Sequence, residues 1–468
     1  MIHWTLILRA FKGCGSSAGQ FRTGLSACIG LVLLLGSPAA LQAQSESLPG
    51  ALSLQAAYGL ALKNNQNLVA SREEVSQAVE DVRIATSPLL PQVNLQGQAL
   101  HQKEFNVPAT RPDSYRSLSI SASQHLYQGG KRRFDRQASQ FLLESERSRH
   151  YRLAQDVLFS VATSFYQVLL AERSIEIAEK QLDRTKRQLE RAMQRFEVGL
   201  VDRTAVLRAR VQVANAREQL ERSENNRGVA MENLALELGA EEPPDQLLSP
   251  EEVEFGKQLV QPYTELAFEK RRDLQELEET IQALDRRTRS EQADITWPEF
   301  SAQGSYTHTD QEELFFDEHE DWQVALKAEY PLFTGWRNTA EVSRARADQR
   351  AARARYERLR QAINAQVRSV YLDIRTQEKV IKSLEDQVES SRSNYEQTVA
   401  QFNEGLASSV DVVVAEADLN EVENRLANAR FTYQLAQIQL KLATGTLYQD
   451  RLDAWMDSLP ASGADGQR

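Results

Sequence analysis

The densest group of side chains that could do chemistry is an acidic run in the second half of the chain. Seven carboxylates occur within twelve residues: Asp310, Glu312, Glu313, Asp317, Glu318, Glu320 and Asp321. Carboxylate oxygens are the preferred ligands of Ca²⁺ and Mg²⁺, so divalent-cation binding is one interpretation. The spacing does not fit an EF-hand loop, and the alternative that we favour is a solvated loop.

Other residue types that support catalysis or metal binding are not arranged for it. The six histidines show no metal-ligand spacing. Gly130-Lys131 lacks the upstream glycine and the following Ser or Thr of a phosphate-binding loop. No nucleophile–base arrangement is recognisable either. The sequence therefore predicts no enzyme, no metal site and no cofactor.

The N-terminus has the organisation of a secretory signal peptide. Arg9, Lys12 and Arg22 precede an apolar run at 25–35, and small residues follow up to Ala43. The run is too short to span a membrane as a helix. We therefore expect residues 1–43 to be removed on export, with cleavage near Ala43.

Export changes the composition of the remaining chain. The net charge moves from −11 to −14, because residues 1–43 carry three basic and no acidic residues. Both cysteines, Cys14 and Cys28, lie in the removed segment, which excludes disulfides and thiol chemistry. Export and acidity also argue against nucleic acid as a partner. No stretch of 18 or more apolar residues follows, so we expect no transmembrane helix.

The sequence contains an internal duplication with a period of 206 residues. Gly199-Leu200 recurs as Gly405-Leu406, and Leu126-Tyr-Gln-Gly recurs as Leu332-Phe-Thr-Gly. Apolar residues between these points match at the same offset. Each half predicts a helix, two strands, a very long helix, a glycine turn and a further helix. We expect a first repeat at 44–260, a second at 261–447 and a flexible C-terminal tail at 448–468.

The predicted helices have matching lengths. The long ones, at about 131–198 and 337–404, contain no internal proline or glycine and would each extend roughly 100 Å. Helices of this length need partners along most of it. The shorter helices at 202–238 and 263–296, stacked end to end, would equal one long helix, as would 408–444 stacked on 52–87. Such stacks alongside the long helices would form the wall of a cylinder, with the linker 239–262 at mid-length.

Four stretches alternate between apolar and polar residues, which is typical of strands with one apolar and one polar face. They begin near Val93, Leu118, Phe300 and Trp322, and their polar faces are mostly Ser, Gln, Thr and Asn. Their length of about 10–13 residues approaches the ~9–11 needed to cross a bilayer. Four strands cannot close a barrel, and lipid does not tolerate an open edge. The sequence therefore predicts an oligomer in an outer membrane.

These patterns together resemble the TolC family of outer-membrane efflux and secretion channel proteins. The similarity is carried by Leu52-Ser-Leu-Gln-x-Ala57, the two strand ends Leu126-Tyr-Gln-Gly-Gly130 and Leu332-Phe-Thr-Gly335, and the turns Phe196-x-Val-Gly-Leu200 and Phe402-x-x-Gly-Leu406. It covers about residues 52–447. The resemblance implies a mainly α fold: a homotrimer whose long-helix α-barrel continues into a transmembrane β-barrel with four strands per chain. It also implies a periplasmic adaptor and an inner-membrane pump or ABC transporter as partners.

The resemblance also implies roles for residues at the periplasmic end. The turns with Val198, Gly199, Leu200, Gly405 and Leu406 match the tips that the family presents to adaptors. Glycine at these positions is equally explained by a turn that needs positive φ.

Asp411 matches the first of two aspartate positions that narrow the family's channels, and Phe402 stands where some relatives carry a gate tyrosine. The second aspartate position holds Val414, which departs from the family pattern. Asp411 is equally explained as an aspartate in the first turn of a helix.

The function predicted from sequence is passive conduction of small molecules or secreted polypeptides from a periplasmic pump assembly to the exterior. A periplasmic coiled-coil adaptor or scaffold is the alternative, because such proteins also use long helical hairpins. An outer-membrane porin with a helical appendage fits less well. An arginine-rich run, 344–360, is interpreted as a solvated face of the second long helix.

Overall fold

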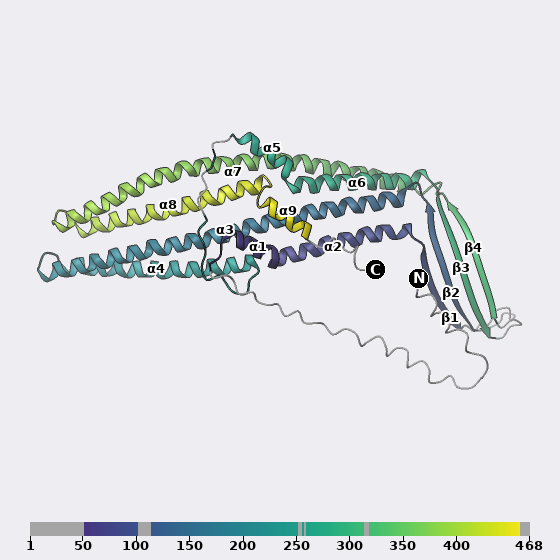
Figure 1. Ribbon diagram of the computed structural model, residues 1–468, viewed down its shortest axis with the longest axis horizontal. Coiled ribbons are helices and arrows are strands. Elements are labelled where there is room, and N and C mark those ends of the chain that lie inside the picture. Colours follow the sequence, from purple (N-terminus) through teal and green to yellow (C-terminus); the bar gives the residue numbers. More distant parts are fainter. Residues whose placement is uncertain (1–50, 102–113, 251–254, 257–258, 313–317, 459–468) are drawn as a thin grey trace, which may run out of the picture. The chain divides into compact units, whose positions relative to one another are not determined.

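The computed structural model describes residues 51–101, 114–250, 255–256, 259–312 and 318–458. The predicted signal peptide, 1–43, and the centre of the acidic run, 313–317, lie outside these residues. All described residues belong to one compact unit. Figure 1 shows its helices running side by side and a small sheet following them.

The first half contains two helices, a short 3-10 turn, a strand pair and a long helical hairpin. Their bounds are α1 Leu54–Asn64, α2 Gln66–Thr86, η1 Ser87–Leu89, β1 Gln92–His101, β2 Ser114–Tyr127, α3 Lys131–Glu197 and α4 Arg203–Leu238. The second half repeats this order with α5 Val260–Lys270, α6 Arg272–Thr296, β3 Glu299–Glu312, β4 Glu318–Glu329, α7 Arg337–Asn403 and α8 Ser409–Ala443. The helix α9, Gln449–Ser458, follows.

The 206-residue period is present in the backbone geometry. Both α3 and α7 have 67 residues, and their starts and ends are 206 positions apart. The residues just before them, Gly130 and Trp336, both have positive φ, and so do the glycines of the two tip turns. Trp336 takes this left-handed conformation although it carries a Cβ, which costs roughly 1 kcal/mol.

The sequence predicted one helix at the start of each half, and the structure has two there. The helix expected at 52–87 is interrupted by Asn65, and the helix expected from Tyr263 is interrupted by Arg271, again 206 positions later. Both residues are extended and buried. Asn65 Nδ2 donates to the carbonyl of Glu237 (2.9 Å), and Arg271 Nη1 donates to that of Ala443 (3.2 Å). Each break therefore satisfies a carbonyl at the C-terminus of the neighbouring helix.

These contacts also correct the expected stacking of the short helices. The end of α4 meets the α1–α2 break, and the end of α8 meets the α5–α6 break, so each stack stays within one half. Gly239 and Gly445 make this approach possible, because a Cβ on them would lie 2.5 Å and 2.9 Å from the backbone oxygens of Asn64 and Lys270. Helix lengths could not decide the pairing, since both pairings give stacks of similar length.

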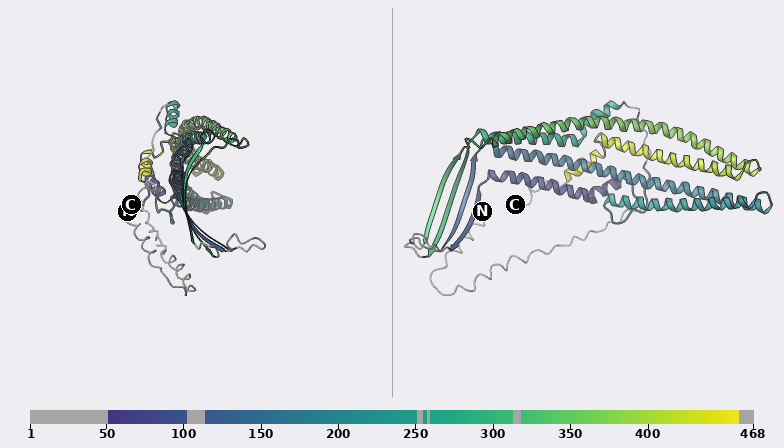
Figure 2. Two further views of the ribbon diagram at one scale, coloured as in Figure 1. Left: turned by 90° about the vertical axis from the view of Figure 1, so that its right-hand side faces the viewer. Right: turned by 180° about the vertical axis from the view of Figure 1, so that it is seen from behind.

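The helices form one layer with two open edges (Figures 1 and 2). Near the sheet the order is α2–α3–α6–α7, and towards the tips it is α4–α3–α8–α7. The apolar core lies between α3 and its neighbours, where Leu158, Val161 and Phe165 are fully buried. This part of α3 is long and apolar enough to cross a membrane by composition, which we did not expect, and its burial between helices explains that composition.

The four strands form one antiparallel sheet in the order β1-β2-β3-β4. Its register aligns like with like. One cross-strand row is Leu95, Ile120, Tyr306 and Trp322, and the next residue on each strand gives the row Gln96, Ser119, Thr307 and Asp321. The sheet thus has an apolar face and a polar face, and large apolar side chains such as Leu95 and Trp322 are more than 70% exposed. Strands β1 and β4 each have an unpaired edge among the described residues.

The tail expected to be flexible contains a helix that packs on the core. Leu452 of α9 is fully buried, and the ring of Trp455 stacks on His150 of α3 at 5.3 Å. The apolar side chains of α9 cover the core around α1 and α3, which is why this segment is helical. Residues 459–468 lie outside the described part of the chain.

Candidate functional site

The turns at the ends of the two long helical hairpins have the same geometry. Gly199 N–H donates to Phe196 and Leu200 N–H to Arg195, and 206 positions later Gly405 donates to Phe402 and Leu406 to Gln401. This pair of bonds closes a helix end only if the glycine has positive φ, here 73° and 79°. The apolar residues that follow stay in solvent, with Leu200 69% and Leu406 81% exposed.

The predicted tip residues therefore lie together at the surface. Val198, the residue before the first glycine, is also 69% exposed. Near the first turns of α4 and α8 a groove of about 380 Å³ is lined largely by apolar side chains, among them Leu207, Val211 and Val410. Exposed apolar groups gathered at one end of a protein are typical of a docking surface.

Arg195 ties one tip to the other. Its guanidinium donates to the carbonyls of Phe402 and Asn403, both at 2.6 Å, and lies over the Phe402 ring at 4.9 Å. These carbonyls end α7, where the helix dipole concentrates partial negative charge, so a cation is favoured there. Phe402 is only 7% exposed and belongs to the contact between the hairpins. Arg195 was not identified from the sequence, because its partners are more than 200 positions away.

Asp411 begins α8 as part of a capping box. Its carboxylate accepts from the backbone N–H and the hydroxyl of Ser408, both at 2.8 Å, and Ser408 Oγ accepts from Asp411 N–H. These hydrogen bonds hold the pKa of Asp411 below its ordinary value. The Asp411 side chain is exposed, so its carboxylate faces solvent while it caps the helix.

Further exposed acidic residues continue the Asp411 face of α8. Asp418 lies two helical turns on, and Val414, at the predicted second position, lies between them and is 53% exposed. Residues seven apart on a helix share a face, a spacing that could have identified Asp418 from the sequence.

The opposite face of α8 carries a buried charged cluster that holds it against α3. Arg184 Nε lies 3.5 Å from Glu416 Oε1, its Nη2 donates to Asn420 Oδ1, and Glu423 Oε2 lies 3.9 Å away. Glu416 is 4% exposed. Burial raises the pKa of Glu416, although the charge of Arg184 opposes this. We call Arg184, Glu416, Asn420 and Glu423 the inter-hairpin cluster.

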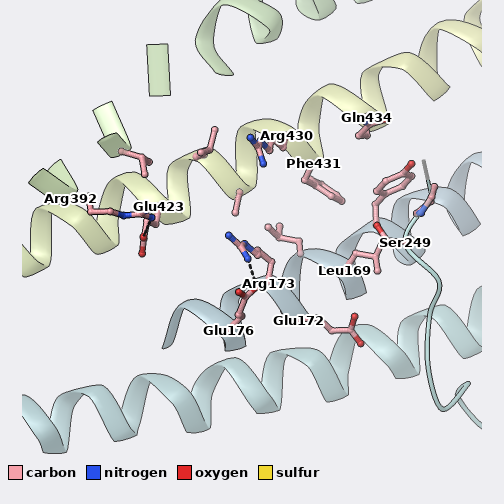
Figure 3. A pocket seen from close by; sticks show the side chains of 16 residues that line it. Leu169, Glu172, Arg173, Glu176, Ser249, Arg392, Glu423, Arg430, Phe431 and Gln434 are labelled. Atoms are coloured by element: carbon pink, nitrogen blue, oxygen red, sulfur yellow. Dashed lines mark hydrogen bonds and ion pairs between the residues drawn. The ribbon is translucent and has the colours of Figure 1, made fainter. Parts of the chain in front are cut away.

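On the sheet side of this cluster, the two hairpins are separated by a surface hollow of about 480 Å³ (Figure 3). Arg173 of α3 and Arg430 and Phe431 of α8 extend into it from opposite walls, and Ser249 of the linker closes one side. Arg430 pairs with Glu385 at 2.7 Å, and Arg173 pairs with Glu176. Because these charges are compensated within the chain, they indicate no charged ligand for the hollow.

The acidic run, for which we favoured a solvated loop over divalent-cation binding, lies within two strands where the structure describes it. Asp310 belongs to β3 and Glu320 and Asp321 to β4, so these residues form part of the sheet and not of a loop. No group of three or more potential metal ligands is found in the described ranges.

The sequence profile of outer membrane efflux proteins matches residues 57–240 and 264–446, one stretch in each half. The chain belongs to the outer membrane efflux protein family.

Relatives within this family are similar along most of their length. TolC of Vibrio cholerae is 27% identical over 85% of this chain and 91% of its own. The alkaline protease secretion protein AprF of Pseudomonas aeruginosa is 25% identical over 86% of each chain. The solved structure of CusC superposes with a TM-score of 0.75 at 20% identity, covering 84% of this chain and 92% of its own.

Membership of the outer membrane efflux family confirms the resemblance, the fold class and the outer-membrane location with a periplasmic helical part. It also decides against a periplasmic adaptor, the alternative that the helical hairpins had left open. The family consists of channel proteins and not of enzymes.

Proposed function

We propose that three copies of this chain form a channel that conducts solutes from a periplasmic adaptor and an inner-membrane pump or ABC transporter to the exterior. The observation that carries the proposal is the sheet, with its exposed apolar face, its polar face and its two unpaired edges. An unpaired edge is not tolerated in lipid, so β1 of one copy must pair with β4 of the next. Three copies would close a twelve-stranded barrel, whose polar face lines a water-filled passage.

The helical layer supports the same closure. Its two open edges, α2 with α4 on one side and α7 on the other, continue from β1 and β4 respectively. Joining the α2–α4 edge of one copy to the α7 edge of the next gives a closed ring in which no helical edge stays free. The apolar side chains exposed along these edges, such as Ile84 on α2 and Leu372 on α7, would then be covered.

The tips are the proposed contact with the adaptor. Val198, Leu200 and Leu406 present apolar side chains to solvent, and the groove beside α4 and α8 adds further apolar surface. Gly199 and Gly405 hold these turns in shape, which is a structural contribution to docking. An adaptor with apolar side chains at the end of a helical hairpin would fit this surface.

The gate is proposed at the same end. Asp411 with Asp418 would place carboxylates from three copies around the passage, and Phe402 would hold α7 against Arg195 while the gate is closed. Opening would require α7 and α8 to move away from α3. This movement would break the contacts of Arg195 and of the inter-hairpin cluster, and it would widen the hollow of Figure 3, which lies between α3 and α8.

The conduction proposal is tested by current recordings of the detergent-purified protein in planar bilayers. Asp411→Asn keeps an oxygen that can accept from Ser408, so the cap survives while three charges are removed from the ring. We expect this variant to conduct with a smaller preference for cations over anions. Wild-type-like selectivity in Asp411→Asn and in Asp418→Asn would overturn the gate assignment, and a protein that inserts without conducting would overturn the channel.

A further inference from the structure

The strongest unexplained feature of the described surface is a group of arginines on α7 near the sheet. Between residues 337 and 360 this helix has eight arginines and three acidic residues. Six of the arginines are exposed and have no carboxylate among the described residues within 4.0 Å: Arg344, Arg346, Arg350, Arg353, Arg355 and Arg358. On α3, by contrast, arginines such as Arg147, Arg149 and Arg152 have partners within the chain.

Unpaired arginines on an edge helix are available to an acidic partner outside the chain. Helix α7 packs on α5, α6 and α8, and its other side is free among the described contacts. That free side carries small residues between the arginines, including Ser343, Ala347 and Ala354, all exposed. Small side chains let a second helix approach closely, and flanking arginines can then reach carboxylates on it.

The opposite edge of the same chain has the complementary surface. Helix α2 packs on α3, and its outward face carries Glu73, Glu80 and Asp81, all exposed. Glu73 lies 3.8 Å from Arg72 and Glu80 pairs with Arg83 at 2.5 Å, but both carboxylates remain more than half exposed and can accept another guanidinium. Val69 and Ile84 on this face supply apolar contact.

The charges also match in height. Helix α2 ends next to the sheet at Thr86, and α7 begins next to it at Arg337. Arg350 and Glu73 are each thirteen residues from these ends, which is ~20 Å at the helical rise. Arg344 is seven residues from its end, and Glu80 is six. Two copies joined edge to edge, with their sheets level, would therefore bring these residues together.

We propose that the arginine face of α7, centred on Arg344 and Arg350, binds the acidic face of α2, centred on Glu73 and Glu80, in the next copy of this chain. This inference rests on the proposed ring of three copies and assigns its contact just below the membrane. The contact fixes which edge meets which, because two α7 edges would repel each other and so would two α2 edges. It also makes assembly sensitive to salt, since exposed ion pairs are screened.

Charge reversal tests this assignment. Arg344→Glu with Arg350→Glu should lower the trimer fraction at least about tenfold at low salt, because like charges then face each other. Glu73→Arg with Glu80→Arg should do the same. All four substitutions in one chain restore opposite charges and should return the trimer. Arg187→Glu, an exposed charge reversal on the interior helix α3, is the matched control and should leave assembly unchanged.

The readout is the mass of the detergent-solubilised protein by light scattering at 50 and 500 mM NaCl, together with resistance of the oligomer to SDS before heating. If both double-reversal variants keep the trimer fraction of the wild type, the inference is overturned and the proposed channel is unaffected. Failure of the fourfold variant to recover would also overturn it. A wild-type protein that is monomeric in every detergent would instead overturn the ring of three copies. The double variant Arg344→Glu with Arg350→Glu could instead stay trimeric and lose binding to anionic phospholipid vesicles. That result would assign the arginine face to lipid and overturn the inference.

Discussion

Substitution of Glu416 is the sharpest test of how the two helical hairpins are held together. The Arg184 side chain is 15% exposed. Glu416→Leu removes its carboxylate partner at 3.5 Å and leaves Asn420 and the more distant Glu423. Removing one partner of a buried ion pair costs about 3–5 kcal/mol. Because Asn420 and Glu423 remain, we expect about 2 kcal/mol, which shifts the equilibrium between joined and separated hairpins about thirtyfold.

The double variant Arg184→Met with Glu416→Leu separates a lost charge pair from lost packing. It removes both charges and keeps side chains of similar volume, and such replacements are often neutral or stabilising. The double variant should therefore resemble the wild type more closely than either single variant does.

Distances between spin labels measure the result directly. The chain has no cysteine after Cys28, so cysteines introduced at Arg187 on α3 and Asp418 on α8, both exposed, can be labelled selectively. Labelled chains diluted with unlabelled ones report distances within one chain. We expect a longer-distance population in Glu416→Leu that is small in the wild type and in the double variant. Identical distributions in all three proteins would refute the idea that this cluster joins the hairpins.

The same contact should depend on pH. Burial raises the pKa of Glu416 above the value it has when α8 moves away. The joined state therefore binds a proton more readily. This proton-linked contribution to its stability is fully present below the ordinary pKa of Glu416 and is lost as pH rises through the raised pKa, while the other contacts of the inter-hairpin cluster remain. The longer-distance population should grow with pH in the wild type. Glu416→Gln should remove that dependence, and an unchanged pH profile in this variant would assign it to another group.

Three further outcomes follow from the contacts described. Val324→Lys on the apolar face of the sheet should lower the free energy of unfolding of the membrane-inserted protein by about 2–4 kcal/mol. Gln323→Lys on the polar face should have little effect, and equal losses would contradict the assignment of the two faces. Arg195→Ala should increase cleavage by protease at the tips without changing the melting temperature by more than a few degrees, and unchanged cleavage would contradict its bridging role. Gly445→Ala should lower the melting temperature, because alanine at φ 75° is strained by roughly 1 kcal/mol and its Cβ would lie 2.9 Å from the Lys270 carbonyl.

The sequence was sufficient for the features that repeat along it. Period-two alternation predicted four strands, and their register joins the expected faces into continuous rows, such as Leu95 with Ile120. The glycine turns and the ends of the long helices are set by local chemistry, so they too were predicted closely.

Features that depend on contacts between distant segments were missed. Neither proline nor glycine marks the helix breaks, because Asn65 and Arg271 stabilise an extended residue through carbonyls about 170 positions away. Arg195 and Arg184 look like solvated charges in the sequence, and only the contacts of α3 with α8 and with the end of α7 give them partners. Helix lengths likewise could not say which short helices stack, since that depends on the order of helices in the layer.

The 206-residue period limits how a chain of this kind can change its length. Shortening α3 by seven residues would preserve its heptad face but would raise one tip by about 10 Å relative to the other. Arg195 would then lie far from the end of α7, and the two turns would no longer present a common rim. Viable length variants should therefore carry equal insertions or deletions at four places, in α3, α4, α7 and α8, so that the reach of the protein across the periplasm changes in whole heptads.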